Sequence, residues 1–199
     1  MKKIICLALL MFGLTVSAQN ELPQSAVEIA PLLIGEKIPD VILKSVDNQD
    51  VNLTSLFNKK RTVLVFYRGG WCPYCNLHLA ALAEAEKELL ALGYQIIAIS
   101  PDAPKNLKIT EEKVKVNYLL LSDSNGELAK SVGLAFQAPE NYKPVINKGS
   151  EGLNSTFLPV PAVFLVNLNG EIEFEHITPN YKSRITNDLL IAVAKSLIK

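Results

Sequence analysis

The sequence predicts an α/β fold with a central mixed β-sheet flanked by helices, and three observations support it. Apolar runs rich in β-branched and aromatic residues, at residues 62–67 and 94–100, are typical of strands buried on both faces of a sheet. A helical pattern at residues 73–92 separates these two runs, as a parallel strand pair requires. Asn169-Gly170 between two later apolar runs indicates a tight antiparallel hairpin.

The remaining elements follow the same patterns along the chain. We expect further strands at residues 41–43, 51–53, 118–121, 162–166 and 172–176, and further helices at residues 54–57, 106–115, 126–132 and 184–198. Residues 136–156, rich in Pro, Gly, Asn and Lys, show no clear period and are expected to form a long loop, of a kind that is often functional.

The N-terminal residues 1–18 predict a secretory signal peptide. Lys2 and Lys3 precede an apolar run over residues 4–16, and small residues up to Ala18 form a cleavage site. The run is shorter than the roughly 20 residues that span a bilayer, and an uncleaved N-terminal anchor is the alternative. We expect a protein exported to the periplasm or cell envelope, with no stable membrane insertion after cleavage.

The mature chain is expected to be an extended lead-in at residues 19–33 followed by one domain at residues 34–199. A length of 199 residues suits a single domain with its own core. Lys and Arg number 20, and Asp and Glu also number 20, so the formal net charge is zero. A neutral balance gives no electrostatic reason to expect nucleic-acid binding.

Cleavage after Ala18 would remove Cys6 and leave only Cys72 and Cys75 of the three cysteines. Two residues between cysteines close too small a loop to stabilise a fold, so the pair is expected to be chemical. A zinc site needs four ligands, and only His78 and His176 could complete it, so no metal is expected. Buried inert thiols are the weakest alternative, because a junction beside two glycines is usually accessible.

Cys72 lies where a buried strand and a glycine loop lead into a helix. Free N–H groups and the helix dipole favour a thiolate there, and the pKa of such a cysteine can fall to roughly 3.5–7.5 from about 8.5. Pro73 suits the first helical turn, where a missing N–H has no cost. Cys75 lies one turn further on and within reach of Cys72.

Residues 66–75, Phe-Tyr-Arg-Gly-Gly-Trp-Cys-Pro-Tyr-Cys, resemble the active-site segment of the thioredoxin superfamily. The surrounding chain resembles the peroxiredoxin-like branch of the AhpC/TSA family at residues 35–40, 98–102 and 158–164, so a thioredoxin-like fold is implied. No cofactor is expected. The resemblance also implies a cis peptide between Val160 and Pro161 packed against the cysteines. An ordinary trans proline at the start of a strand is the alternative.

Departures from the family pattern bear on the reaction. The peroxidatic cysteine of peroxiredoxins falls on Cys75, but their threonine falls on Cys72, their proline on Arg68 and their arginine near Pro161. The buried acid of thioredoxins is Val65 here. Because the peroxide-activating threonine, proline and arginine are absent while the dithiol is intact, dithiol exchange is the favoured chemistry.

In this mechanism the Cys72 thiolate attacks an oxidised sulfur, and Cys75 then resolves the mixed disulfide. Trp71 and Tyr74 would shape an apolar docking surface, or simply pack. Val160 and Pro161 would offer backbone to an extended partner.

Arg68 and His78 could tune the thiols, His78 either as a charged group that favours the thiolate or as a neutral proton acceptor. A polar surface histidine is the alternative for His78. Asp102, Tyr181 and Arg184 recur in the family pattern without an assignable role.

Three functions remain open. The first is a thiol–disulfide oxidoreductase that acts on a protein or small-molecule substrate and needs an external electron donor. The second is a thiol-dependent peroxidase. The third is a non-catalytic binding module that uses the long loop.

Overall fold

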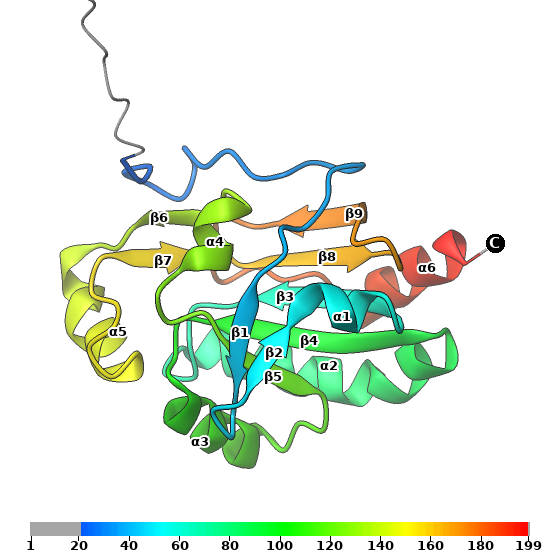
Figure 1. Ribbon diagram of the computed structural model, residues 1–199, viewed down its shortest axis with the longest axis horizontal. Helices are drawn as coiled ribbons and strands as arrows, with labels where there is room; N and C mark the ends of the chain where they lie inside the picture. The colour runs from blue at the N-terminus through cyan, green and yellow to red at the C-terminus, as the bar shows by residue number, and fades with distance from the viewer. Residues whose placement is uncertain (1–20, 199) are drawn as a thin grey trace, which may run out of the picture.

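The computed structural model describes residues 21–198 (Figure 1). The predicted signal peptide, residues 1–18, lies outside the described residues. Within residues 21–198, no helix has the length and apolar character needed to cross a membrane.

Seven strands form one mixed sheet in the order β2-β1-β5-β4-β3-β8-β9. Strand β4 pairs in parallel with both β3 and β5, whereas β8 pairs antiparallel with β3 and β9. The strands span Ile42–Ser45 (β1), Asp50–Asn52 (β2), Arg61–Phe66 (β3), Tyr94–Ser100 (β4), Leu119–Ser122 (β5), Ala162–Val166 (β8) and Ile172–Ile177 (β9). The predicted mixed sheet is thereby confirmed.

Helices cover both faces of the sheet (Figure 1). The helices span Leu53–Phe57 (α1), Pro73–Ala91 (α2), Pro104–Val114 (α3), Glu127–Ser131 (α4), Lys143–Gly149 (α5) and Asn187–Leu197 (α6). Helices α2, α3 and α6 share one apolar core with the sheet, and α1 and α4 share another on the opposite face. The terminal helix begins at Asn187, three residues later than its predicted start, and Thr186 caps it by accepting the Leu189 N–H.

Alternation along β3 sends its side chains into these two cores. Val63 and Val65 belong to the core under α2, and Leu64 and Phe66 to the core on the opposite face. All four are at most 1% exposed, as the unbroken apolar run predicts. Tyr67 continues the alternation toward α2, so β3 delivers the chain to the side of the sheet on which the cysteines lie.

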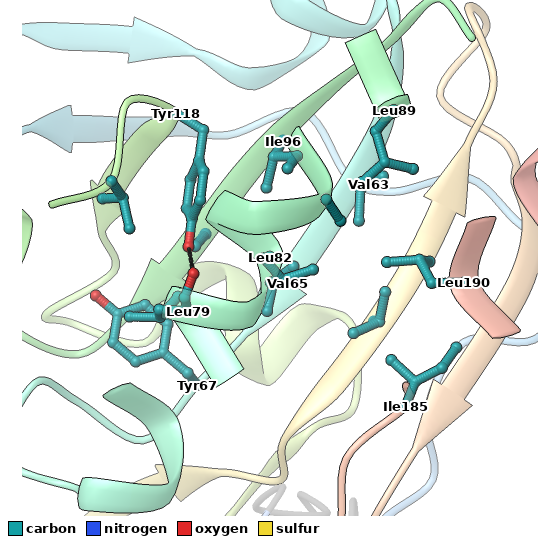
Figure 2. Packing of buried hydrophobic residues seen from close by; sticks show 14 of the residues in the cluster. Val63, Val65, Tyr67, Leu79, Leu82, Leu89, Ile96, Tyr118, Ile185 and Leu190 are labelled. Carbon is teal, nitrogen blue, oxygen red and sulfur yellow. Dashed lines mark hydrogen bonds between the residues drawn. The ribbon is translucent and has the colours of Figure 1, made fainter. Parts of the chain in front are cut away.

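The core under α2 includes one buried polar contact (Figure 2). The Tyr118 hydroxyl donates to the Leu79 carbonyl on α2 at 2.7 Å. Leu82 and Leu89 of the same helix are fully buried. A buried phenol with a hydrogen-bond partner avoids the cost of an unsatisfied polar group, so Tyr118 fastens α2 over the sheet.

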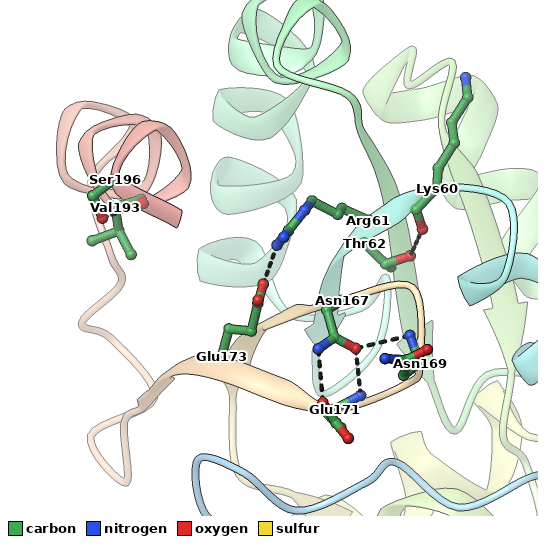
Figure 3. A network of polar contacts seen from close by, with 9 residues as sticks. All are labelled: Lys60, Arg61, Thr62, Asn167, Asn169, Glu171, Glu173, Val193 and Ser196. Atoms are coloured by element: carbon green, nitrogen blue, oxygen red, sulfur yellow. Dashed lines mark hydrogen bonds and ion pairs between the residues drawn. The ribbon is translucent and has the colours of Figure 1, made fainter. Parts of the chain in front are cut away.

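The predicted hairpin joins β8 to β9 (Figure 3). The Asn167 side chain accepts the backbone N–H groups of Asn169 and Glu171 at 2.8 and 3.0 Å. Gly170 has a φ of 79°, a left-handed conformation that glycine adopts without a Cβ clash. Beside the turn, an ion pair between Arg61 and Glu173 links the start of β3 to β9.

The prediction of a long loop at residues 136–156 is wrong. The segment contains part of β6 (Ala135–Gln137), the 3₁₀ helix η1 (Glu140–Tyr142) and helix α5, and it leads into β7 (Phe157–Pro159), which pairs with β6. Elements of three to seven residues are too short to show a hydrophobic period. Their conformation depends instead on local hydrogen bonds made by side chains. The Asn154 amide, for example, accepts the N–H groups of Thr156 and Phe157 and donates to the Phe157 carbonyl.

The implied cis peptide between Val160 and Pro161 is also wrong, because this bond is trans. The Val160 N–H donates to the Leu134 carbonyl at 2.9 Å, and the Pro161 carbonyl accepts the Thr178 N–H at 3.0 Å. These two bonds hold the backbone extended into β8, which begins at Ala162. Pro161 is therefore the trans proline that precedes a strand.

Candidate active site

Cys72 and Cys75 lie at the start of α2. Cys72 is the N-cap residue, Pro73 opens the helix, and the Cys72 carbonyl accepts the Cys75 N–H at 3.1 Å. Cys72 is 1% exposed and Cys75 is fully buried. The expectation of accessible thiols beside the two glycines is therefore wrong, since side chains from both neighbouring and distant segments cover them.

Arg68 is the first of these covering groups. Its Nη1 lies 3.8 Å from the Cys72 Sγ, and the residue is only 4% exposed. Its guanidinium carbon lies 4.8, 4.3 and 4.2 Å from the ring centroids of Trp71, Tyr142 and Tyr181. No carboxylate within residues 21–198 forms a salt bridge with it.

Arg184 is the second group that covers the thiols. Its Nη2 lies 3.6 Å from the Cys75 Sγ, while its Nη1 donates to the backbone carbonyls of Tyr181 and Ser183. These bonds orient the guanidinium toward the buried thiol. Each sulfur of the pair therefore has its own arginine.

The two thiols differ in ionisation. The hydrogen bond from the Cys75 side chain lowers the pKa of Cys72 to about 6; burial opposes this, while the Cys75 backbone N–H, Arg68 and Arg184 add to it. The same sulfur–sulfur contact, together with burial, raises the pKa of Cys75 well above its usual value. At neutral pH, Cys72 is a thiolate and Cys75 a thiol. The predicted order of nucleophile and resolving thiol has this physical basis.

Asp102 supports the loop before Cys72. Its buried carboxylate accepts the Gly70 N–H at 2.6 Å, and burial raises the pKa of Asp102 to about 6 against the effect of that bond. The Gly70 carbonyl accepts from the Asn76 side chain at 2.9 Å. A Cβ on Gly70 would lie 1.9 Å from the Thr110 Oγ1, so only glycine fits there.

The other predicted tuning and docking residues divide into exposed and buried groups. Tyr74 is 38% exposed, and its ring meets that of Tyr181 edge-on at 5.8 Å between centroids. His78 is buried, and burial, with smaller effects from Arg184 and His176, lowers its pKa to about 4. The expectation of a charged His78 is therefore wrong at neutral pH, and the alternative of a surface histidine is also wrong.

Val160 and Pro161 do not offer free backbone groups to an extended partner, contrary to the expectation from the sequence. Val160 is fully buried in the core on the opposite face of the sheet from the thiols. The Val160 N–H and the Pro161 carbonyl are already bonded within the fold, so neither is offered to a partner. Pro161 instead lines a largely apolar pocket of about 200 Å³ beside Arg68 and Tyr181.

Sequence reasoning missed Tyr142 altogether and left Tyr181 and Arg184 without roles. Tyr142 belongs to the segment expected to be a loop, and Arg184 lies 109 positions after Cys75. No local pattern signals such contacts. Within residues 21–198, no group of three or more His, Cys, Asp and Glu side chains could hold a metal ion.

Comparison with known proteins shows which family this chain resembles. The model of the AhpC/TSA family matches residues 34–175. A Haemophilus influenzae protein named as a peroxiredoxin of the bcp type is 34% identical over 104 residues, which cover 52% of this chain and 66% of that protein. Peroxiredoxin Bcp of Escherichia coli is 27% identical over 161 residues, which cover 81% of this chain and 94% of that protein.

Solved structures show the same fold. Reduced Prx3 of Vibrio vulnificus in complex with hydrogen peroxide has a TM-score of 0.69 at 18% identity, covering 82% of this chain and 96% of that chain. Peroxidoxin BcpB of Mycobacterium tuberculosis has a TM-score of 0.66 at 19% identity, covering 82% and 97%. The fold is thioredoxin-like, and the chain belongs to the AhpC/TSA family.

Proposed function

We propose that this protein is a thiol-dependent peroxidase in which the Cys72 thiolate is oxidised by a hydroperoxide and Cys75 closes a disulfide. One observation carries the proposal: two buried cysteines lie together, each beside an arginine guanidinium. This arrangement suits a small oxidant that enters a covered site. Exchange with protein disulfides, favoured by the sequence pattern, becomes the second candidate.

Burial separates the two reactions. A thiolate that attacks the disulfide of a folded protein must present its sulfur at the surface, whereas Cys72 is 1% exposed. A hydroperoxide needs to bring only two oxygen atoms to the sulfur. The pocket beside Arg68, lined also by Pro161 and Tyr142, lies next to this site.

The chemistry balances as two steps. The Cys72 thiolate attacks the terminal peroxide oxygen, the O–O bond breaks, and protonation of the leaving oxygen gives an alcohol or water and a sulfenic acid on Cys72. Cys75 then loses its proton and attacks that sulfur, which forms the disulfide and releases water. An external thiol donor supplies the two electrons that restore the dithiol.

The arginines answer the main objection from the sequence. No arginine occupies the family position near Pro161, yet Arg68 and Arg184 bring guanidinium groups to the two sulfurs from other positions. A guanidinium stabilises both the thiolate and the negative charge that develops on the leaving oxygen. The family's threonine and proline remain absent.

The relatives support the same choice, since several are named peroxiredoxins. Dithiol exchange keeps one observation in its favour. Tyr74 and Leu77, 38% and 69% exposed, lie on the same helix as Cys75 and line an open pocket that suits an extended partner. The predicted signal peptide supports activity in the periplasm or cell envelope, where an electron donor must be supplied.

Trp71, the only tryptophan of the chain, adjoins Cys72 and offers an intrinsic fluorescent probe beside the sulfur. We expect its fluorescence to change rapidly when the reduced protein is mixed with hydrogen peroxide in a stopped-flow instrument, and slowly with a model disulfide at equal concentration. Cys75→Ser should stop at a sulfenic acid on Cys72 that dimedone traps, and Cys72→Ser should remain unoxidised.

The outcomes separate the candidates. Faster oxidation by the disulfide than by peroxide would replace peroxidase activity with dithiol exchange. Slow oxidation by both reagents would favour a binding module. Dimedone found on Cys75 in the Cys72→Ser variant, with none on Cys72 in Cys75→Ser, would reverse the two cysteine roles.

A further inference from the structure

We propose, on the basis of the proposed function, that Tyr142 and Tyr181 are positioning residues that hold the Arg68 guanidinium against the Cys72 Sγ. With Trp71 they form an aromatic cage around the guanidinium. Two segments far from the thiols in the chain would then control how readily Cys72 reacts.

The cage is assembled from three separate segments. Trp71 comes from the loop before α2, Tyr142 from η1, and Tyr181 from the connection between β9 and α6. The ring centroids of Trp71 and Tyr142 are 5.5 Å apart, and the interplanar angle is 34°. Because all three rings lie within 4.8 Å of the guanidinium carbon, Arg68 has little room to turn away from Cys72.

Aromatic rings hold a cation without cancelling its charge. A carboxylate beside Arg68 would form an ion pair and compete with the thiolate for the guanidinium, but no described carboxylate forms one. Ring faces attract a cation through their quadrupole and do not neutralise its charge. The buried guanidinium can therefore direct its charge to Cys72, 3.8 Å away.

Four titratable or charged groups act on Cys72 from the elements around it. Cys75 lies on α2, Arg68 follows β3, Arg184 precedes α6 and Tyr142 belongs to η1. Arg184 contacts Cys75, and its guanidinium is fixed by backbone carbonyls. Arg68 is thus the group at Cys72 whose position depends on the tyrosine rings.

The test titrates Cys72 alone, in the full chain carrying Cys6→Ser and Cys75→Ser, by the ultraviolet absorption of the thiolate and by the pH profile of alkylation with iodoacetamide. Arg68→Gln should raise the pKa of Cys72 by about one unit or more, since an opposite charge at this distance is removed. Tyr142→Ala combined with Tyr181→Ala should raise it by about half a unit to one unit.

Two comparisons distinguish positioning from a general structural role. Tyr142→Phe with Tyr181→Phe keeps the ring faces and removes the Tyr142 hydroxyl, whose pKa is lowered by a hydrogen bond from Arg68, so it should shift the pKa of Cys72 less than the double alanine variant does. Arg61→Gln removes an arginine at the opposite end of β3, which pairs with Glu173 and lies over the Tyr94 ring, and should leave the titration of Cys72 unchanged. Circular dichroism checks that each variant is folded.

An unchanged pKa of Cys72 in Arg68→Gln would overturn the proposal. So would a raised pKa of Cys72 in Arg68→Gln together with an unchanged pKa in the double alanine variant. Both tyrosines lie at least partly exposed, so the double variant carries the test if Arg68→Gln fails to fold. Neither readout uses a peroxide. Expected shifts in a protein that peroxide oxidises slowly would therefore reject the peroxidase function and retain the cage.

Discussion

The Arg184 guanidinium reaches the Cys75 Sγ at 3.6 Å, although the two residues are 109 positions apart in the chain. Cys75 is fully buried and its pKa is raised, so it holds a proton that it must lose before it can form a disulfide. In the proposed mechanism, Arg184 stabilises the thiolate that forms at that moment. The segment before α6 therefore completes a site that begins on α2.

Arg184→Gln should slow disulfide formation more than the first oxidation of Cys72. Loss of one guanidinium from a buried sulfur is expected to cost about tenfold in the rate of disulfide closure, which corresponds to about one pKa unit on Cys75. Rapid-quench mass spectrometry after a peroxide pulse would show the Cys72 sulfenic acid accumulating. The rate of disulfide closure in Arg184→Lys should lie between the rates in the native protein and in Arg184→Gln. Equal slowing of Cys72 oxidation and of disulfide closure would contradict a specific role of Arg184 at Cys75.

The oxidation rate of Cys72 should follow its own ionisation. With a pKa of about 6, the rate should be about tenfold lower at pH 5 than on a plateau reached near pH 7, because the thiolate is the reactive form. The measurement is the second-order rate constant with hydrogen peroxide across this range. Asp102 titrates near the same pH, so the profile should persist in Asp102→Asn; a profile that rises only above pH 8 would contradict the lowered pKa.

Gly70→Ala should destabilise the fold and disturb the loop before Cys72. The added Cβ would lie 1.9 Å from the Thr110 Oγ1, and overpacking of this kind costs about 1–3 kcal/mol. Chemical denaturation measures the loss. Thr110→Ala removes the clashing oxygen, so the double variant should recover part of the stability, and strictly additive losses would show that this contact is not the cause.

Asp102→Asn should change how stability depends on pH. The pKa of Asp102 is raised in the folded state from 3.8 to about 6. Its contribution to stability is therefore fully present below about pH 4 and lost as the pH rises through 6. Asparagine stays neutral and can still accept the Gly70 N–H, so the variant should gain about 1–3 kcal/mol relative to the native protein between pH 4 and pH 7.

Urea denaturation at the two pH values tests this difference. Asp123 is also buried with a pKa raised to about 6, but it is present in both proteins and cancels in the comparison. Parallel losses of stability in the native protein and the variant would show that Asp102 does not titrate in this range.

Local sequence determined most of the architecture. Strands buried on both faces, such as β3, carry unbroken apolar runs, and the long helix α2 carries enough turns for its pattern to be visible. The proximity of the two cysteines was also predictable, because Cys72 and Cys75 lie one helical turn apart at a strand-to-helix junction. These features depend on neighbours within a few positions, and a sequence displays such neighbours directly.

Tertiary structure decided the environment of the thiols. The burial of Cys72, the cage around Arg68 and the approach of Arg184 arise where segments up to 109 positions apart meet. A helix as short as α5 carries no period, and a trans bond at Pro161 depends on the partners of its neighbouring backbone groups. A sequence shows which residues could react, but their charge and access depend on distances that exist only after folding.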